Sequence, residues 1–151
     1  MRSQIAVLVA AGLSLAAGSP AFAQKAAPTA KTASEYYVKY HAAMSSAKSV
    51  EDLRPFMDPA QQKEMDAASK EEKEMGVKMI SSMYADMTGV KVVKETAKGS
   101  SYTLDVTATQ ASDKQAGTGT VEVVKDGAGW RVESETWKFG SSTMTLKSKK
   151  P

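Results

Sequence analysis

The change of hydrophobic period at Gly89 is the feature that most limits what this chain can fold into. Before Gly89, apolar residues recur about every 3.6 residues, which is the period of an amphipathic helix. After it, apolar and polar residues alternate, as in "SYTLDVTAT" (101–109), which is the period of a strand with one buried face. Helices followed by strands are typical of the α+β class, in which helices pack on one face of an antiparallel sheet.

The helical part contains three start signals. Each is a side chain that can accept a hydrogen bond from the first turn of a helix: Thr32, Asp58 and Ser69. A proline follows Asp58 directly, at the first helical position, where proline is favoured. The last helix, over 70–87, should end at Gly89, which stands where a C-terminal cap belongs.

The second part predicts an antiparallel meander. Each expected turn carries a glycine, in Lys98-Gly99, Asp126-Gly127 and Gly140-Ser141, and such pairs suit tight hairpins. The expected strands are 90–96, 101–109, 117–125, 129–139 and 142–147.

Two tryptophans in the fourth strand raise a question of orientation. Trp130 and Val132 share a face and should point to the core. Strict alternation would place Trp137 on the opposite face, together with Glu133 and Glu135. A β-bulge near 134–136 would turn Trp137 back to the core, so both orientations stay open.

The first 23 residues have the pattern of a secretory signal peptide. Arg2 precedes an apolar run, and Ala21-Phe22-Ala23 offers small residues where a signal peptidase reads them. We expect cleavage after Ala23, and therefore a periplasmic or secreted protein with no integral membrane segment in the mature chain. A flexible linker (24–33), one α+β domain (34–147) and a basic tail (148–151) should follow.

Composition excludes several classes of protein. The chain has no cysteine, so it has neither disulfides nor the cysteine that anchors a bacterial lipoprotein. Its formal net charge of +3 among 151 residues is too small for a nucleic-acid-binding footprint. Gly117-Thr118-Gly119 has no helix after it to bind a phosphate, and no other motif requires a cofactor, so we expect none.

The order of elements resembles the nuclear transport factor 2-like superfamily. The resemblance covers about residues 33–140: a tyrosine-rich first helix, the turn "SVEDLRPFM", a further helical stretch, and a late hairpin, "VEVVKDGAGWRVESETW". It implies a sheet curled around the helices into a cone with a pocket. Members of the superfamily include isomerases, dehydratases and binding modules, and many dimerise through their sheets. This chain departs from the typical pattern because no short strand separates its early helices.

If the cone is present, its expected walls are Tyr40, Tyr84 and Leu104, around a small apolar ligand. An enzyme of the isomerase or dehydratase type would need a pocket acid or base. The weak candidates are Asp105 and His41, the only histidine. Alternation places Asp105 on the face opposite Leu104, away from such a ligand.

Methionines recur at 75, 79, 83 and 87 on the last helix. Thioethers favour Cu(I), and they are also flexible core fillers. Each step of four residues drifts by about 40° around a helix, so the four cannot form one site. Neighbouring residues such as Met79 and Met83 could share an ion with Met44 or His41.

Three readings follow from these observations. The first is an exported, non-enzymatic module that binds a small apolar ligand or a partner protein. The second is a cavity enzyme that transfers protons, and the third is a Cu(I)-handling protein.

Overall fold

The structure is a computed structural model that describes residues 28–127 and 129–148. The predicted signal peptide, the first four residues of the linker (24–27) and the end of the basic tail (149–151) lie outside these residues. In chain order the elements are α1 (Ala33–Ser46), α2 (Val50–Leu53), the 3₁₀ turn η1 (Arg54–Phe56), α3 (Pro59–Ala67), α4 (Lys70–Asp86), β1 (Met87–Lys98), β2 (Ser101–Gln110), β3 (Ala116–Asp126), β4 (Gly129–Phe139) and β5 (Ser142–Lys147).

The predicted helix starts are confirmed. The side chains of Thr32, Asp58 and Ser69 each accept a hydrogen bond from the backbone N–H three residues later, at 3.1, 2.8 and 3.2 Å. These bonds satisfy N–H groups that the first turn of a helix leaves without a partner. Helix α3 buries no residue, as its polar sequence predicts. None of the helices in the described part of the chain has the length and apolar character needed to cross a bilayer.

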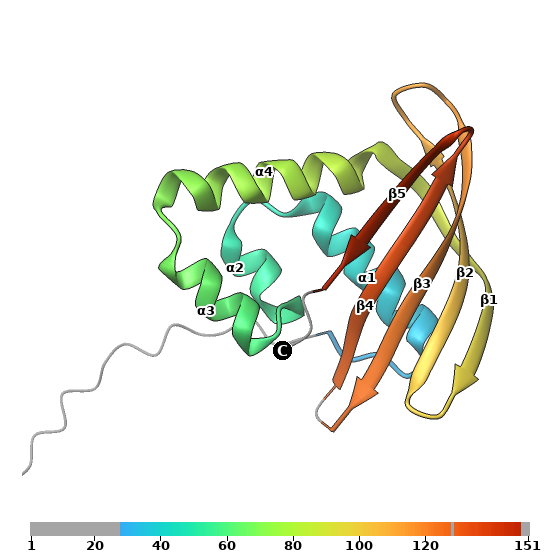
Figure 1. Ribbon diagram of the computed structural model, residues 1–151, viewed down its shortest axis with the longest axis horizontal. Coiled ribbons are helices and arrows are strands. Elements are labelled where there is room, and N and C mark those ends of the chain that lie inside the picture. The colour runs from blue at the N-terminus through green and yellow to red at the C-terminus, as the bar shows by residue number, and fades with distance from the viewer. Residues whose placement is uncertain (1–27, 128, 149–151) are drawn as a thin grey trace, which may run out of the picture.

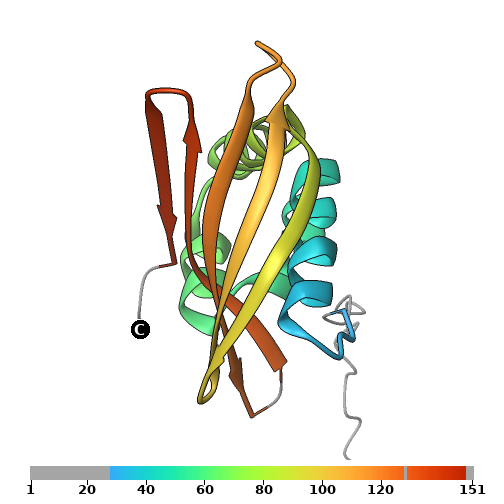
Figure 2. The ribbon, with the colours of Figure 1, turned by 90° about the vertical axis from the view of Figure 1, so that its right-hand side faces the viewer.

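The five strands form one antiparallel sheet in the order β1-β2-β3-β4-β5, so the predicted meander is confirmed. The helices gather on one face of this sheet, with α1 and α4 nearest to it (Figure 1). Turned by 90°, the strands lie in front of the helices, and the β4–β5 hairpin forms one border of the sheet (Figure 2). The fold class is therefore α+β, with the core between the helices and the inner face of the sheet.

Gly89 has a different role from the one expected. Helix α4 ends at Asp86, and Met87 already begins β1. Gly89 lies within β1 with φ of 61°, where the pairing between Thr88 and Lys91 shifts register against β2. The glycine is therefore needed for a β-bulge rather than for a helix cap, because a positive φ strains other residues.

A second bulge, in β4, decides the orientation of Trp137. Val132 pairs with Val123, but the next pair joins Ser134 to Glu122, so Glu133 is an extra residue. Residues after the bulge exchange faces. Trp137 is consequently fully buried, with an exposed fraction of 0%. The sequence pattern suggested a bulge near 134–136, and the observed bulge lies one residue earlier, at Glu133.

Glycines in β3 make room for this aromatic residue and its neighbour. Gly119 pairs with Trp137, and Gly117 pairs with Phe139. A Cβ at Gly119 would lie 2.8 Å from the indole ring, and one at Gly117 would lie 2.3 Å from the phenyl ring. Trp137 and Phe139 stack with ring centroids 5.8 Å apart over this glycine surface. Gly117-Thr118-Gly119 therefore serves core packing.

Trp130 is packed against the core but only partly buried. Its ring stacks on Tyr36 at 6.4 Å, and its indole N–H donates to the carbonyl of Ala30 at 3.1 Å. Ala33, at the start of α1, is fully buried. The packed chain thus reaches into the segment that the sequence suggested was a flexible linker.

Candidate functional site

The most unusual buried group is Glu135, a carboxyl side chain with an exposed fraction of 1%. It lies in β4 two residues before Trp137, and the bulge at Glu133 turns it toward the helices. The Tyr37 hydroxyl of α1 donates to its Oε1 at 2.6 Å. The Tyr84 hydroxyl of α4 donates to its Oε2. Glu135 therefore ties both long helices to the sheet.

Tyr40 and His41 complete the cluster. Because the Tyr84 hydroxyl donates its hydrogen bond to Glu135, the Tyr40 hydroxyl, 3.2 Å away, donates to the Tyr84 oxygen. The His41 ring lies edge-on to Tyr84 with centroids 5.3 Å apart. Positions 37, 40 and 41 share a face of α1 because residues three and four apart are helical neighbours. We call Tyr37, Tyr40, His41, Tyr84 and Glu135 the tyrosine–glutamate cluster.

Burial shapes the protonation of this cluster. Burial raises the pKa of Glu135, while hydrogen bonds from Tyr37 and Tyr84 lower it. The buried indole N–H of Trp137 lies near enough to lower this pKa slightly, but it is too poorly aligned to count as a hydrogen bond. Burial also raises the pKa of Tyr37 and Tyr84 far above the usual range, so both remain donors. For His41, burial lowers the pKa and favours the neutral ring.

Replacing Glu135 with glutamine should change how stability depends on pH. A carboxyl whose pKa is raised in the folded protein binds its proton more tightly there than in the unfolded chain. It therefore stabilises the fold at acid pH, and this contribution is lost as pH rises through the folded pKa. We expect the unfolding free energy of the wild type, relative to Glu135→Gln, to fall from acid toward neutral pH. Urea denaturation of both proteins over this range measures the difference, and a constant difference would contradict the raised pKa.

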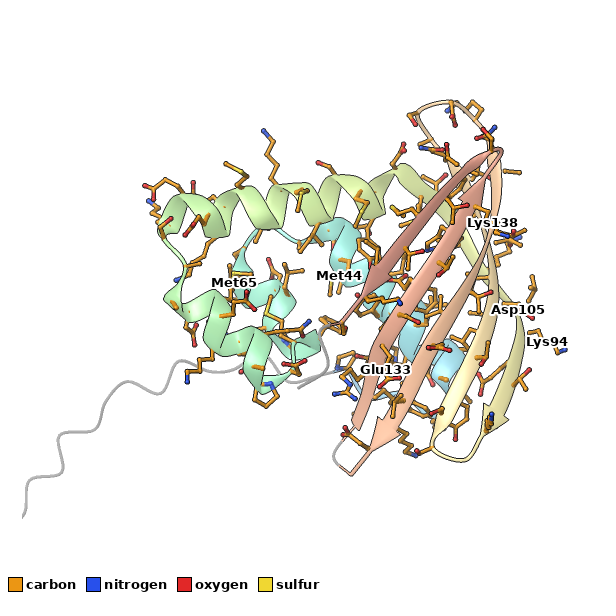
Figure 3. The ribbon with its side chains drawn as sticks, viewed as in Figure 1. Met44, Met65, Lys94, Asp105, Glu133 and Lys138 are labelled. Carbon is orange, nitrogen blue, oxygen red and sulfur yellow. The ribbon has the colours of Figure 1, made fainter. Side chains whose placement is uncertain are left out.

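The predicted pocket walls are instead part of the core. Tyr84 and Leu104 have exposed fractions of 3% and 0%, and Tyr40 is partly buried. None of the three lines either of the cavities described below. Asp105 is exposed on the outer face of the sheet, where it points away from the helices (Figure 3). The inward-facing strand carboxyl is Glu135, which the assumption of strict alternation had placed outside.

A cavity of about 700 Å³ lies between the end of α4 and the β4–β5 hairpin. We call it the methionine groove, because the side chains of four methionines line it together with Phe139: Met79, Met83, Met87 and Met144. Its polar lining residues are Ser82, Asp86, Gln110, Asp113, Gln115, Ser142 and Thr143. The groove thus has an apolar wall and a polar rim, as small-molecule sites commonly do.

One wall of the groove is a loop fastened to the end of α4. The Asp86 carboxylate accepts from the backbone N–H of Ser112 at 2.8 Å and from its hydroxyl at 3.0 Å. The Asp86 carbonyl accepts from the N–H of Ala111 at 2.7 Å. The hydrogen bonds of Asp86, first among them one with Gln110, hold its pKa below the usual value. The wall is therefore held in place and carries negative charge.

The methionines that line the groove differ in how far they are buried. Met87 is buried, with an exposed fraction of 4%, and acts as a core filler. Met79 is 67% exposed, and Met83 and Met144 are partly buried, so their thioethers remain accessible. Of the residues considered from the sequence, Met79 and Met83 line the groove, whereas Met44, Met75 and His41 do not. Met144, on β5, is the partner that sequence reasoning missed.

A second, more open depression lies on the outer face of the sheet and has a volume of about 640 Å³. Lys91 and Lys138 line it with small residues and threonines. Threonine is common on the solvent face of a strand, so this surface needs no ligand to explain it.

Within residues 28–127 and 129–148, no three histidine, aspartate or glutamate side chains gather in a way that could hold a metal ion. Comparison with known proteins adds no assignment: no protein-family model, no curated protein and no solved structure matches this chain.

Proposed function

We propose that this protein is a non-enzymatic binding module whose ligand site is the methionine groove. The observation that carries the proposal is the separation of the groove from the tyrosine–glutamate cluster. The accessible cavity has an apolar wall, whereas the only inward-facing acid among the five strands in the described residues is sealed by Tyr37 and Tyr84. Cluster and groove share no residue.

The size and chemistry of the groove favour a small apolar ligand. Sites for such ligands commonly enclose about 300–1,000 Å³ and combine apolar walls with a few polar groups. Methionine adds an adaptable, polarisable wall, which suits ligands of varied shape. Asp86 is held by Ser112, and Asp113 accepts from the N–H of Gln115 at 3.1 Å, so both carboxylates already have structural roles.

A fluorescent apolar probe tests this proposal. We expect 1-N-phenylnaphthylamine to brighten on binding the protein, and Ser82→Trp, which places an indole in the groove, to abolish the increase. Ala85→Trp is the matched control, because Ala85 is exposed on α4 and does not line the groove. Equal fluorescence from both variants would show that the probe binds elsewhere.

We also propose that the module is exported and has the cone fold of the nuclear transport factor 2-like superfamily. The pattern of residues 1–23 supports export to the periplasm or beyond. Helices followed by a five-stranded antiparallel meander are consistent with such a cone. N-terminal sequencing of the mature protein should begin at or next to Gln24, and an intact Met1 in that protein would refute export.

A further inference from the structure

We propose that the methionine groove binds one Cu(I) ion through the thioethers of Met79, Met83 and Met144. This inference rests on the proposed function and adds a second kind of ligand, a soft cation, to the same site. Two of these residues are on α4 and one is on β5, and all three line one cavity. The site is therefore formed by two elements that are distant in the sequence and border the same cavity.

The helical geometry suits a pair of ligands from α4. Met79 and Met83 are one turn apart, so their side chains differ in direction by about 40° around the helix. Met144 is the cross-strand neighbour of Trp137 in the β4–β5 pair, so the two residues lie on the same, inner face of the sheet. Met144 supplies the third sulfur from the opposite wall, in place of Met44 or His41. Two helical thioethers and one strand thioether are a soft donor set, which Cu(I) prefers over harder cations.

The accessibility of Met79 distinguishes it from the methionines that pack in or against the core. Met44 and Met87 are buried in the core, with exposed fractions of 6% and 4%, and Met83 and Met144 are partly buried where they pack against it. Met79 leaves 67% of its surface exposed and Met75 leaves 71%, and of these two only Met79 lines the cavity. Met79 therefore presents an accessible thioether to the cavity.

The charge of the groove favours a cation. Its lining residues include two carboxylates, Asp86 and Asp113, and no lysine, arginine or histidine. The hydrogen bonds of Asp86 keep its pKa low, so it is ionised at neutral pH. A monovalent soft cation therefore meets neutral sulfur ligands in a negative surrounding, whereas an anion would be repelled.

Anaerobic titration of Cu(I) against a chromogenic chelator tests the inference. We expect the wild type to remove one equivalent of Cu(I) from the chelator. The triple variant Met79→Leu, Met83→Leu and Met144→Leu should lose this transfer, because leucine keeps the volume and removes the sulfur. Met75→Leu is the matched control: Met75 is 71% exposed one turn before Met79 but does not line the groove. Denaturation midpoints show whether each variant remains folded.

The apolar probe separates failure of this inference from failure of the proposed function. The triple leucine variant keeps an apolar groove, so 1-N-phenylnaphthylamine should still bind to it. Absence of Cu(I) transfer to the wild type, with probe binding intact, would overturn the copper site alone. A triple variant that binds Cu(I) as the wild type does would overturn it as well. If the wild type binds neither Cu(I) nor the probe, both proposals are wrong.

Discussion

Replacing Trp137 with alanine is expected to lower the free energy of unfolding by about 3–5 kcal/mol, the usual cost of truncating a large buried aromatic residue. Trp137 has an exposed fraction of 0%, and its ring lies on Phe139 and against Gly119. Truncation removes these contacts and leaves a cavity that a β-sheet cannot easily close. Urea denaturation followed by far-ultraviolet circular dichroism measures the loss.

Trp130→Ala is the matched control for this prediction. Trp130 lies in the same strand but before the bulge, and it is only partly buried. Its truncation should therefore cost less than that of Trp137, because less apolar surface returns to water. If Trp130→Ala destabilises the protein more than Trp137→Ala, the bulge at Glu133 does not turn Trp137 into the core.

Tyr84→Phe is expected to destabilise the protein by about 1–3 kcal/mol, the range for leaving a buried polar group without its hydrogen-bond partner. The change removes one of the two tyrosine hydroxyls that donate to Glu135, and it leaves the Tyr40 hydroxyl without its acceptor. Desolvation of the carboxyl group is then less well compensated. Equilibrium denaturation in urea gives the measurement.

Tyr102→Phe controls for the general effect of losing a tyrosine hydroxyl. Tyr102 is partly buried on β2, and its ring contacts Trp130, on the part of β4 before the bulge, with centroids 5.1 Å apart. This variant should keep nearly wild-type stability. Equal losses from Tyr84→Phe and Tyr102→Phe would mean that the tyrosine–glutamate cluster adds nothing specific to the fold.

Local patterns were enough to predict the order of elements. Caps such as Thr32 and Ser69 mark helix starts because they satisfy backbone N–H groups within a few residues. The alternation in β2 depends only on the buried face of one sheet, and Leu104 and Asp105 indeed lie on opposite faces. Information of this kind is contained within each segment, so a single sequence is sufficient.

The candidate sites depend on features that no single segment contains. One extra residue at Glu133 exchanges the faces of β4, and alternation alone cannot show where a bulge falls. Strict alternation from Trp130 therefore predicted that Glu135 is exposed. The spacing of Glu135, Trp137 and Phe139 by two residues does place them on one face, but it does not show which face that is. Met144 lines the same cavity as the helical methionines only because the fold places the β4–β5 hairpin across from the end of α4, which no local pattern contains.

Methionine methyl NMR tests most directly whether the ligand site is the groove or the tyrosine–glutamate cluster. The protein would be labelled at the methionine methyl groups and at the indole nitrogens, then titrated with 1-N-phenylnaphthylamine. We predict that the signals of Met79, Met83 and Met144 shift with the probe, while those of Met44 and the Trp137 indole stay in place. Shifts of the Trp137 indole with unchanged groove methionines would contradict the account and place the ligand in the core beside Glu135.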